Sequence, residues 1–298
     1  MRYDETPLHF ECEGCDLIGI LARPQRGATV GVVIVVGGPQ YRVGSHRQFV
    51  LLSRALASEG VACLRFDYRG MGDSEGEALP FDATIPDIGA AVAALRREIP
   101  GLRSIVLWGL CDGASASAFA ADDLQVNGLA LFNPWVRSAQ LQLETTVRHY
   151  YARRLMDRRF WMSLATGRVG IASAARNFVC ATAGLLARRS PPSHGADLAT
   201  RVGKAIATRP RPTLIALSEN DQTAAEFRLA SRATGALHDA LQLSCVSCVD
   251  VREADHTFST RVWRDSVASL TIAWIRNNFQ VEGAIQPGRT DCVMHTTG

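Results

Sequence analysis

The feature that most constrains the fold of this chain is a Gly-x-Cys-x-Gly turn at residues 109–113. The apolar run 104–108 before it predicts a strand, and the small residues 114–121 after it predict a helix. Such a strand–turn–helix is a nucleophile elbow, here with cysteine in the usual place of serine. The helix N-terminus beneath Cys111 would stabilise a thiolate and a developing oxyanion. A buried cysteine beside a tight turn, which needs glycine for its own shape, is the alternative left open.

A histidine near the end of the chain lies where a catalytic base is expected. In α/β hydrolases the nucleophile comes first in the sequence, the acid second and the histidine last, the two partners in loops after strands. The run 246–251 predicts a strand, and His256 follows it. Of the seven histidines it is the one in this position. We therefore predict that His256 is the base, although a lone histidine is more commonly a surface or capping residue.

Three carboxylates compete for the role of the acid. The run 212–217 predicts a strand, and both Glu219 and Asp221 follow it, whereas Asp255 directly precedes His256. Asp221 lies deepest in its loop and directly before a predicted helix at 223–236. We therefore predict the triad Cys111, Asp221 and His256.

Acyl transfer also needs two backbone N–H groups that hold the oxyanion. One comes from the residue after the nucleophile, here Asp112, and the other from the loop after the third strand. That loop is Gly-Gly-Pro-Gln at residues 37–40, and Pro39 has no N–H to donate. Gly38 is therefore the predicted second donor, unless it serves only the shape of the loop.

Alternating apolar runs and amphipathic segments predict an α/β-hydrolase fold, with a mostly parallel central sheet and helices on both faces. The first part of this core is expected at 1–136 and the second at 212–281. Between them, 137–211 is expected to form a helical lid insertion, and 282–298 a mobile tail. Strands are expected at 9–13, 17–23, 31–36, 61–66, 104–108, 127–132, 212–217 and 246–251, and helices at 46–59, 84–98, 114–121 and 223–236.

Composition and cysteine spacing narrow the function classes. Hydrophobic residues make up 47% of the 298, which excludes wholesale disorder, and no apolar stretch is long enough to cross a membrane. The start of the chain carries no export signal, so we expect a cytoplasmic protein without a transmembrane segment. Two Cys-x-x-Cys pairs, at 12–15 and 245–248, are expected at opposite ends of the sheet. We therefore predict free thiols, no metal site and no cofactor.

The charge is unevenly distributed. The net charge is +3, yet residues 137–209 hold thirteen Arg or Lys against three Asp or Glu. Such asymmetry favours an anionic partner, which we expect to be an acyl substrate, small or carrier-bound, rather than nucleic acid. A solvated surface rich in arginine by coding bias is equally compatible, because Lys204 is the only lysine in the chain. The sequence predicts no oligomeric state.

Beyond the general pattern, three motifs carry a narrower resemblance. GGPQYR at 37–42, RFDYRGMGDS at 65–74 and WGLCDGAS at 108–115 together resemble the exosortase A system-associated hydrolase 1 family. The hydrolase pattern itself covers roughly residues 8–280. The resemblance implies a cytoplasmic bacterial hydrolase encoded with genes for exopolysaccharide biosynthesis and protein sorting. A cysteine in the elbow is also similar to dienelactone hydrolases, which open lactone esters.

The function predicted from these features is hydrolysis of an ester, thioester or lactone by a cysteine nucleophile. Two alternatives stay open. The same triad could transfer the acyl group to a hydroxyl other than that of water, which would make the protein an acyltransferase. Alternatively, the protein keeps the hydrolase fold but catalyses no reaction, and acts as a non-catalytic binding module.

Overall fold

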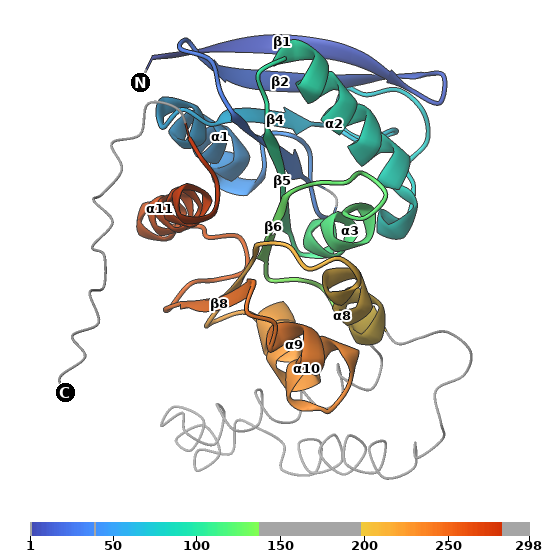
Figure 1. Ribbon diagram of the computed structural model, residues 1–298. Coiled ribbons are helices and arrows are strands. Elements are labelled where there is room, and N and C mark those ends of the chain that lie inside the picture. The colour runs from blue at the N-terminus through green and yellow to red at the C-terminus, as the bar shows by residue number, and fades with distance from the viewer. Residues whose placement is uncertain (1, 39, 137–197, 282–298) are drawn as a thin grey trace, which may run out of the picture.

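The computed structural model describes residues 2–38, 40–136 and 198–281, and its centre is an eight-stranded sheet (Figure 1). The strand order is β1-β2-β4-β3-β5-β6-β7-β8. β1 and β2 pair antiparallel, as do β2 and β4, and every pair from β4 to β8 is parallel. The strands are β1 Tyr3–Cys12, β2 Cys15–Pro24, β3 Val30–Val35, β4 Ala62–Phe66, β5 Ser104–Leu110, β6 Gly128–Phe132, β7 Thr213–Ser218 and β8 Val246–Val251.

Helices cover both faces of this sheet. α1 packs against α11 on one face, and α3 packs between α2 and α8 on the other (Figure 1). The helices are α1 Gln48–Ser58, α2 Ile85–Glu98, α3 Asp112–Ala120, α8 Leu198–Thr208, α9 Gln222–Arg232, α10 Ala236–Leu241 and α11 Arg261–Asn278, with short 3-10 turns η1 Ser45–Arg47 and η2 Phe81–Ala83. The predicted α/β-hydrolase class of fold, a mostly parallel sheet between two helical layers, is confirmed.

The strand predictions hold because most of these strands are buried on both faces. Every residue of β3, β4, β6 and β7 is buried, so each reads as a continuous apolar run. The amino-terminal hairpin is longer than predicted, since β1 and β2 pair over ten residues each. The two Cys-x-x-Cys pairs lie at opposite edges of the sheet, as predicted.

Two predictions about the second half of the core are wrong. The helix expected at 223–236 ends earlier, at Arg232, because the backbone is extended at Ala233. A second helix, α10, then begins at Ala236, after Gly235 with its positive φ. β8 is an edge strand rather than a core strand, and Cys248 within it is exposed. Its apolar appearance reflects β propensity instead of burial.

One aromatic cluster fixes the strands that carry the predicted elbow. Trp108 of β5 stacks on Phe132 of β6 with 4.7 Å between ring centroids, and its edge meets Phe49 of α1. The indole N–H donates to the Thr271 hydroxyl of α11 at 3.2 Å, which satisfies the buried polar group. The cluster therefore anchors both helices of one face beneath the end of β5.

Residues 137–197 and 282–298 lie outside the described chain, so the predicted lid up to residue 197 and the predicted tail stay predictions. The carboxyl end of the predicted lid segment contains α8, and there Arg201 pairs with Asp82 and lies over the ring of Phe119. In the described part of the chain, no helix is both long and apolar enough to cross a membrane.

Candidate active site

The turn at Cys111 has the geometry of a sharp elbow. Cys111 has φ 61° and ψ −127°, a strained conformation for a residue with a side chain. A Cβ at Gly109 would lie 2.5 Å from the Gly113 carbonyl oxygen, and a Cβ at Gly113 would lie 2.6 Å from the Val35 carbonyl oxygen. Glycine is therefore required at both positions, because helix α3 approaches β3 and β5 too closely for a side chain.

Backbone hydrogen bonds hold the strained cysteine in place. The Cys111 N–H donates to the Phe132 carbonyl at 3.0 Å, and the Trp135 N–H donates to the Cys111 carbonyl at 3.1 Å. The Ser115 hydroxyl donates to the Trp135 carbonyl at 2.7 Å. The end of β6 thus fixes the elbow, which leaves the half-buried Cys111 side chain at the carboxyl edge of the sheet.

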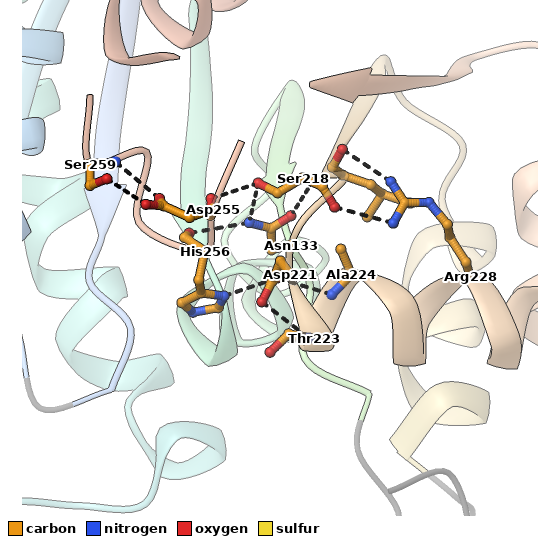
Figure 2. Close-up of polar contacts among 10 residues, drawn as sticks. Asn133, Ser218, Asp221, Thr223, Ala224, Arg228, Asp255, His256 and Ser259 are labelled. Atoms are coloured by element: carbon orange, nitrogen blue, oxygen red, sulfur yellow. Dashed lines mark hydrogen bonds and ion pairs between the residues drawn. The ribbon is translucent and has the colours of Figure 1, made fainter. Parts of the chain in front are cut away.

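His256 and Asp221 meet at this same edge (Figure 2). His256 Nδ1 lies 3.0 Å from Asp221 Oδ2, and the Asp221 side chain is 6% exposed. Asp221 is also the N-cap of α9, where its carboxylate accepts the N–H groups of Thr223 at 3.2 Å and Ala224 at 3.0 Å. These bonds fix the position of the carboxylate beside the imidazole, so it can orient the ring.

The imidazole of His256 is strongly biased toward its protonated form. Burial lowers its pKa, but hydrogen bonding and charge interactions with Asp221 and Cys111 outweigh burial and raise the pKa to about 10. The interaction with Cys111 also places the thiol within reach of the imidazole. The structure therefore brings together all three residues of the predicted triad.

The two competing carboxylates bind backbone groups instead. Glu219 accepts the N–H of Glu253 at 2.8 Å. Asp255 accepts the N–H of Ser259 at 3.0 Å and the hydroxyl of the same residue (Figure 2). Both carboxylates brace the loops that carry Asp221 and His256.

The N–H of Gly38, one of the two predicted oxyanion donors, is already hydrogen-bonded to a side chain. The Gly38 N–H donates to Asp112 Oδ1 at 2.6 Å, and the Gly113 N–H donates to the same oxygen at 3.0 Å. The Asp112 carboxylate also interacts with its own N–H group. Sequence reasoning assigned Asp112 a backbone role only, and its side chain is an unexpected occupant of this position.

Comparison with known proteins identifies the family of this chain. The model of the "Alpha/beta hydrolase family" matches residues 32–268. The chain belongs to the alpha/beta hydrolase family. Over 137 residues it is 28% identical to human "Protein ABHD12B", a match that covers 42% of this chain and only 37% of that protein.

Solved structures share the fold of this chain. An esterase from Pyrococcus furiosus superposes with a TM-score of 0.63 at 16% identity, covering 93% of this chain and 92% of the esterase. A dienelactone hydrolase from Anabaena variabilis superposes with a TM-score of 0.60 at 16% identity, covering 94% and 100%. At these identities the likeness concerns the fold.

Sequence reasoning missed two polar residues that position His256. Asn133 directly follows β6, and Ser218 is the last residue of β7. Both residues are fully buried. The Asn133 amide donates to the His256 carbonyl at 3.2 Å and to the Ser218 hydroxyl at 3.0 Å, and that hydroxyl donates to the Asp255 carbonyl at 3.0 Å (Figure 2). Polar residues directly after apolar strands at one sheet edge were the available signal.

A second network holds the loop that carries Gly38. The Arg42 N–H donates to Asp67 Oδ1 at 2.6 Å, and its guanidinium pairs with Asp67 and Asp73. The side chain of Asp67 is fully buried. The Ser74 hydroxyl donates to the Asp67 carbonyl at 2.9 Å. The loop after β4 therefore braces the loop that carries Gly38.

The described residues offer no group of three His, Cys, Asp or Glu side chains suited to a metal ion. All six cysteines that the structure describes are free thiols. Cys12 is buried and donates to Asp87 at 3.3 Å, and burial together with this carboxylate raises its pKa to about 12. Such a thiol is inert, in contrast to one at the carboxyl edge of the sheet.

Proposed function

We propose that this hydrolase cleaves an ester, thioester or lactone through a Cys111–His256–Asp221 triad. The observation that carries the proposal is the position of His256, which contacts Asp221 at 3.0 Å and interacts with the thiol of Cys111. A nucleophile, a base and an acid that orients the base are the parts that acyl transfer requires.

In the first half of the reaction, His256 holds the proton that Cys111 has released. The thiolate attacks the substrate carbonyl carbon, and the electron pair of the C=O bond moves to the oxygen. The N–H groups of Gly38 and Asp112 bind this oxyanion. When the tetrahedral intermediate collapses, the bond to the leaving alcohol or thiol breaks, and His256 donates its proton to that group.

In the second half, His256 becomes a base. The thiolate charge of Cys111 is one reason for the high pKa of His256, and acylation removes that charge. The pKa of His256 falls, so the neutral imidazole can take a proton from water. The hydroxide attacks the acyl carbon, and the C–S bond of the second intermediate breaks to release the carboxylic acid and the thiolate.

A sulfur nucleophile favours activated acyl groups as substrates. Thioesters, lactones and activated esters need less help for the leaving group, and one structural neighbour is named a dienelactone hydrolase. The motifs at 37–42, 65–74 and 108–115 support a role beside exopolysaccharide biosynthesis in the bacterial cytoplasm. In that setting the acyl group would be small or bound to a carrier.

The excess of arginine at residues 137–209 supports an anionic substrate. Exposed charges are screened over about 10 Å at 0.1 M salt. Turnover of an anionic acyl substrate is therefore expected to fall with added salt, while that of a neutral acyl substrate stays constant. Equal salt sensitivity for both substrates would contradict the anionic preference.

The triad is tested by turnover and by thiol labelling. Purified enzyme is assayed with p-nitrophenyl esters of graded acyl length and with acyl thioesters. Cys111→Ala is expected to abolish turnover without loss of folding, and Cys111→Ser to keep weak activity. His256→Ala is expected to slow the labelling of Cys111 by iodoacetamide near neutral pH. Peptide mass mapping measures the labelling rate. The experiment uses a Cys248→Ser background, because Cys248 is exposed and would also react. Full turnover by Cys111→Ala would overturn the proposal.

A further inference from the structure

The side chain of Asp112 occupies the place where the proposed reaction needs an empty anion site. Its carboxylate interacts with three N–H groups, those of Gly38 at 2.6 Å, of Gly113 at 3.0 Å, and its own. The Gly38 N–H, which makes the shortest of these contacts, is one of the two donors assigned to the substrate oxyanion. A carboxylate oxygen and a tetrahedral oxyanion are chemically alike, since both are anionic oxygens that accept several N–H bonds.

Glycine backbone surrounds the Asp112 carboxylate and leaves room for it. A Cβ at Gly37 would lie 2.6 Å from Asp112 Oδ1 and would collide with the carbonyl of Leu110. Gly38 has φ 59°, which turns its N–H toward the start of α3. The glycines of this loop therefore allow it to close around the Asp112 side chain.

We propose that Asp112 is a specificity-determining residue: its carboxylate fills the oxyanion hole of the resting enzyme, and a substrate carbonyl reacts only after displacing it. This proposal rests on the proposed function, because it concerns the same acyl chemistry. Substrates that bind strongly elsewhere in the site, or that develop negative charge early, displace the carboxylate most readily. Asp112 thereby protects the site against weakly bound esters.

Desolvation opposes the charged form of the Asp112 side chain in this position. Burial raises the pKa of Asp112, and it outweighs the three N–H groups and the charge of His256, which lower that pKa. Burial therefore removes hydration from the carboxylate, and a side chain that leaves the hole regains that hydration. A neutral carbonyl oxygen that gains negative charge only in the transition state has no such initial cost.

The test compares Asp112→Ala and Asp112→Asn with the wild-type enzyme, using p-nitrophenyl acetate and an acyl thioester. Asp123→Asn is the matched control, because Asp123 is an exposed aspartate just beyond the end of α3. One oxyanion donor contributes about 10²–10³ in rate, so emptying the hole is expected to raise kcat/KM by about tenfold. The kcat/KM of Asp112→Asn is expected to lie between those of Asp112→Ala and the wild type, because the amide keeps a hydrogen-bond acceptor but loses the charge.

An inhibitor supplies a second arm of the test. A trifluoromethyl ketone adds to the thiolate and forms an oxyanion in the hole. It is expected to bind more tightly to Asp112→Ala than to wild type by a similar factor. A loss of turnover and of inhibitor binding in both Asp112 variants, with folding intact, would overturn the proposal and make the carboxylate a helper of the reaction. A kcat/KM and an inhibitor affinity that both stay unchanged in the Asp112 variants would overturn the proposal as well.

Amide NMR separates this proposal from the proposed function. In Asp112→Ala the N–H resonances of Gly38 and Gly113 are expected to shift upfield and to exchange faster with solvent, whereas Asp123→Asn leaves them unchanged. Unshifted resonances would show that the carboxylate does not fill the hole. Shifted resonances in a protein whose Cys111→Ala variant still turns over substrate would keep the occupancy and reject the cysteine mechanism.

Discussion

His256 Nδ1 lies 3.0 Å from Asp221 Oδ2. Asp221, the N-cap of helix α9, therefore also orients the imidazole of His256 in the loop after β8. Because β7 and β8 are parallel neighbours, the loops after them open at the same edge. The N–H groups of Thr223 and Ala224 also bind this carboxylate, and these bonds hold it in place beside the histidine. The helix cap and the orientation of the base therefore depend on one side chain.

The first prediction concerns the titration of His256. Its pKa is raised to about 10, with Asp221 as the main opposing influence to burial. Asp221→Asn removes that charge, so the pKa of His256 is expected to fall, and the imidazole becomes neutral at a pH where the wild-type ring is protonated. NMR titration of the imidazole carbon-bound protons measures this shift, and the other six histidines are internal controls. An unchanged His256 titration would contradict the pairing.

The second prediction assigns the acid of the triad. Glu219 and Asp255 bind backbone N–H groups, so Glu219→Gln is expected to change kcat/KM by less than about threefold, whereas Asp221→Asn costs about 10²–10⁴ in kcat. Steady-state assays on the same ester or thioester measure both. A larger loss in Glu219→Gln than in Asp221→Asn would reassign the acid.

The third prediction concerns Asn133, whose side chain positions His256 by a hydrogen bond to the main-chain carbonyl of His256. Asn133 has φ 46°, so Asn133→Gly keeps the backbone relaxed while it removes the hydrogen bonds to His256 and Ser218. We expect a loss of about 1–3 kcal/mol in the free energy of unfolding. We also expect a fall in kcat with little change in KM, because the base is misplaced. Asn278→Ala, which removes one hydrogen bond to the Trp274 carbonyl on α11, is the control.

Much of this architecture follows from patterns that are local in sequence. Buried parallel strands read as apolar runs, and the order of Cys111, Asp221 and His256 after three such runs led to the triad. The missed features depend on side-chain directions, which spacing does not encode. Asp112 was expected to act through its N–H, yet its side chain turns back onto Gly38. Asn133 gave no signal beyond following an apolar strand, because its role depends on a loop far along the chain.

The exposure of β8 and the break between α9 and α10 were missed for a related reason. A strand with β-branched residues reads alike at the edge and at the centre of a sheet, because residue type reports propensity and only packing reports burial. Thr234-Gly235 is a turn signal inside an otherwise helical pattern, and a single glycine is tolerated in many helices. Whether it ends the helix depends on α8, which packs against α10.

The fourth prediction concerns Arg42, which ties the Gly38 loop to the buried carboxylate of Asp67. The Arg42 side chain is 15% exposed and the Asp67 side chain is fully buried, so Arg42→Met leaves a buried carboxylate without its cation. Breaking such a pair costs about 3–5 kcal/mol in the free energy of unfolding, measured by urea denaturation. Turnover is also expected to fall, since the donor loop loses its brace.

Arg276→Met is the matched control for Arg42→Met. Arg276 pairs with Glu59 between α11 and the end of α1, and both side chains are 40% exposed. An exposed pair contributes about 0–1 kcal/mol, because solvent screens the charges. Equal destabilisation by the two variants would mean that Asp67 is not held as a charged group. A stable Arg42→Met variant with reduced kcat and unchanged Gly38 N–H exchange would instead place Arg42 on the substrate rather than on the loop.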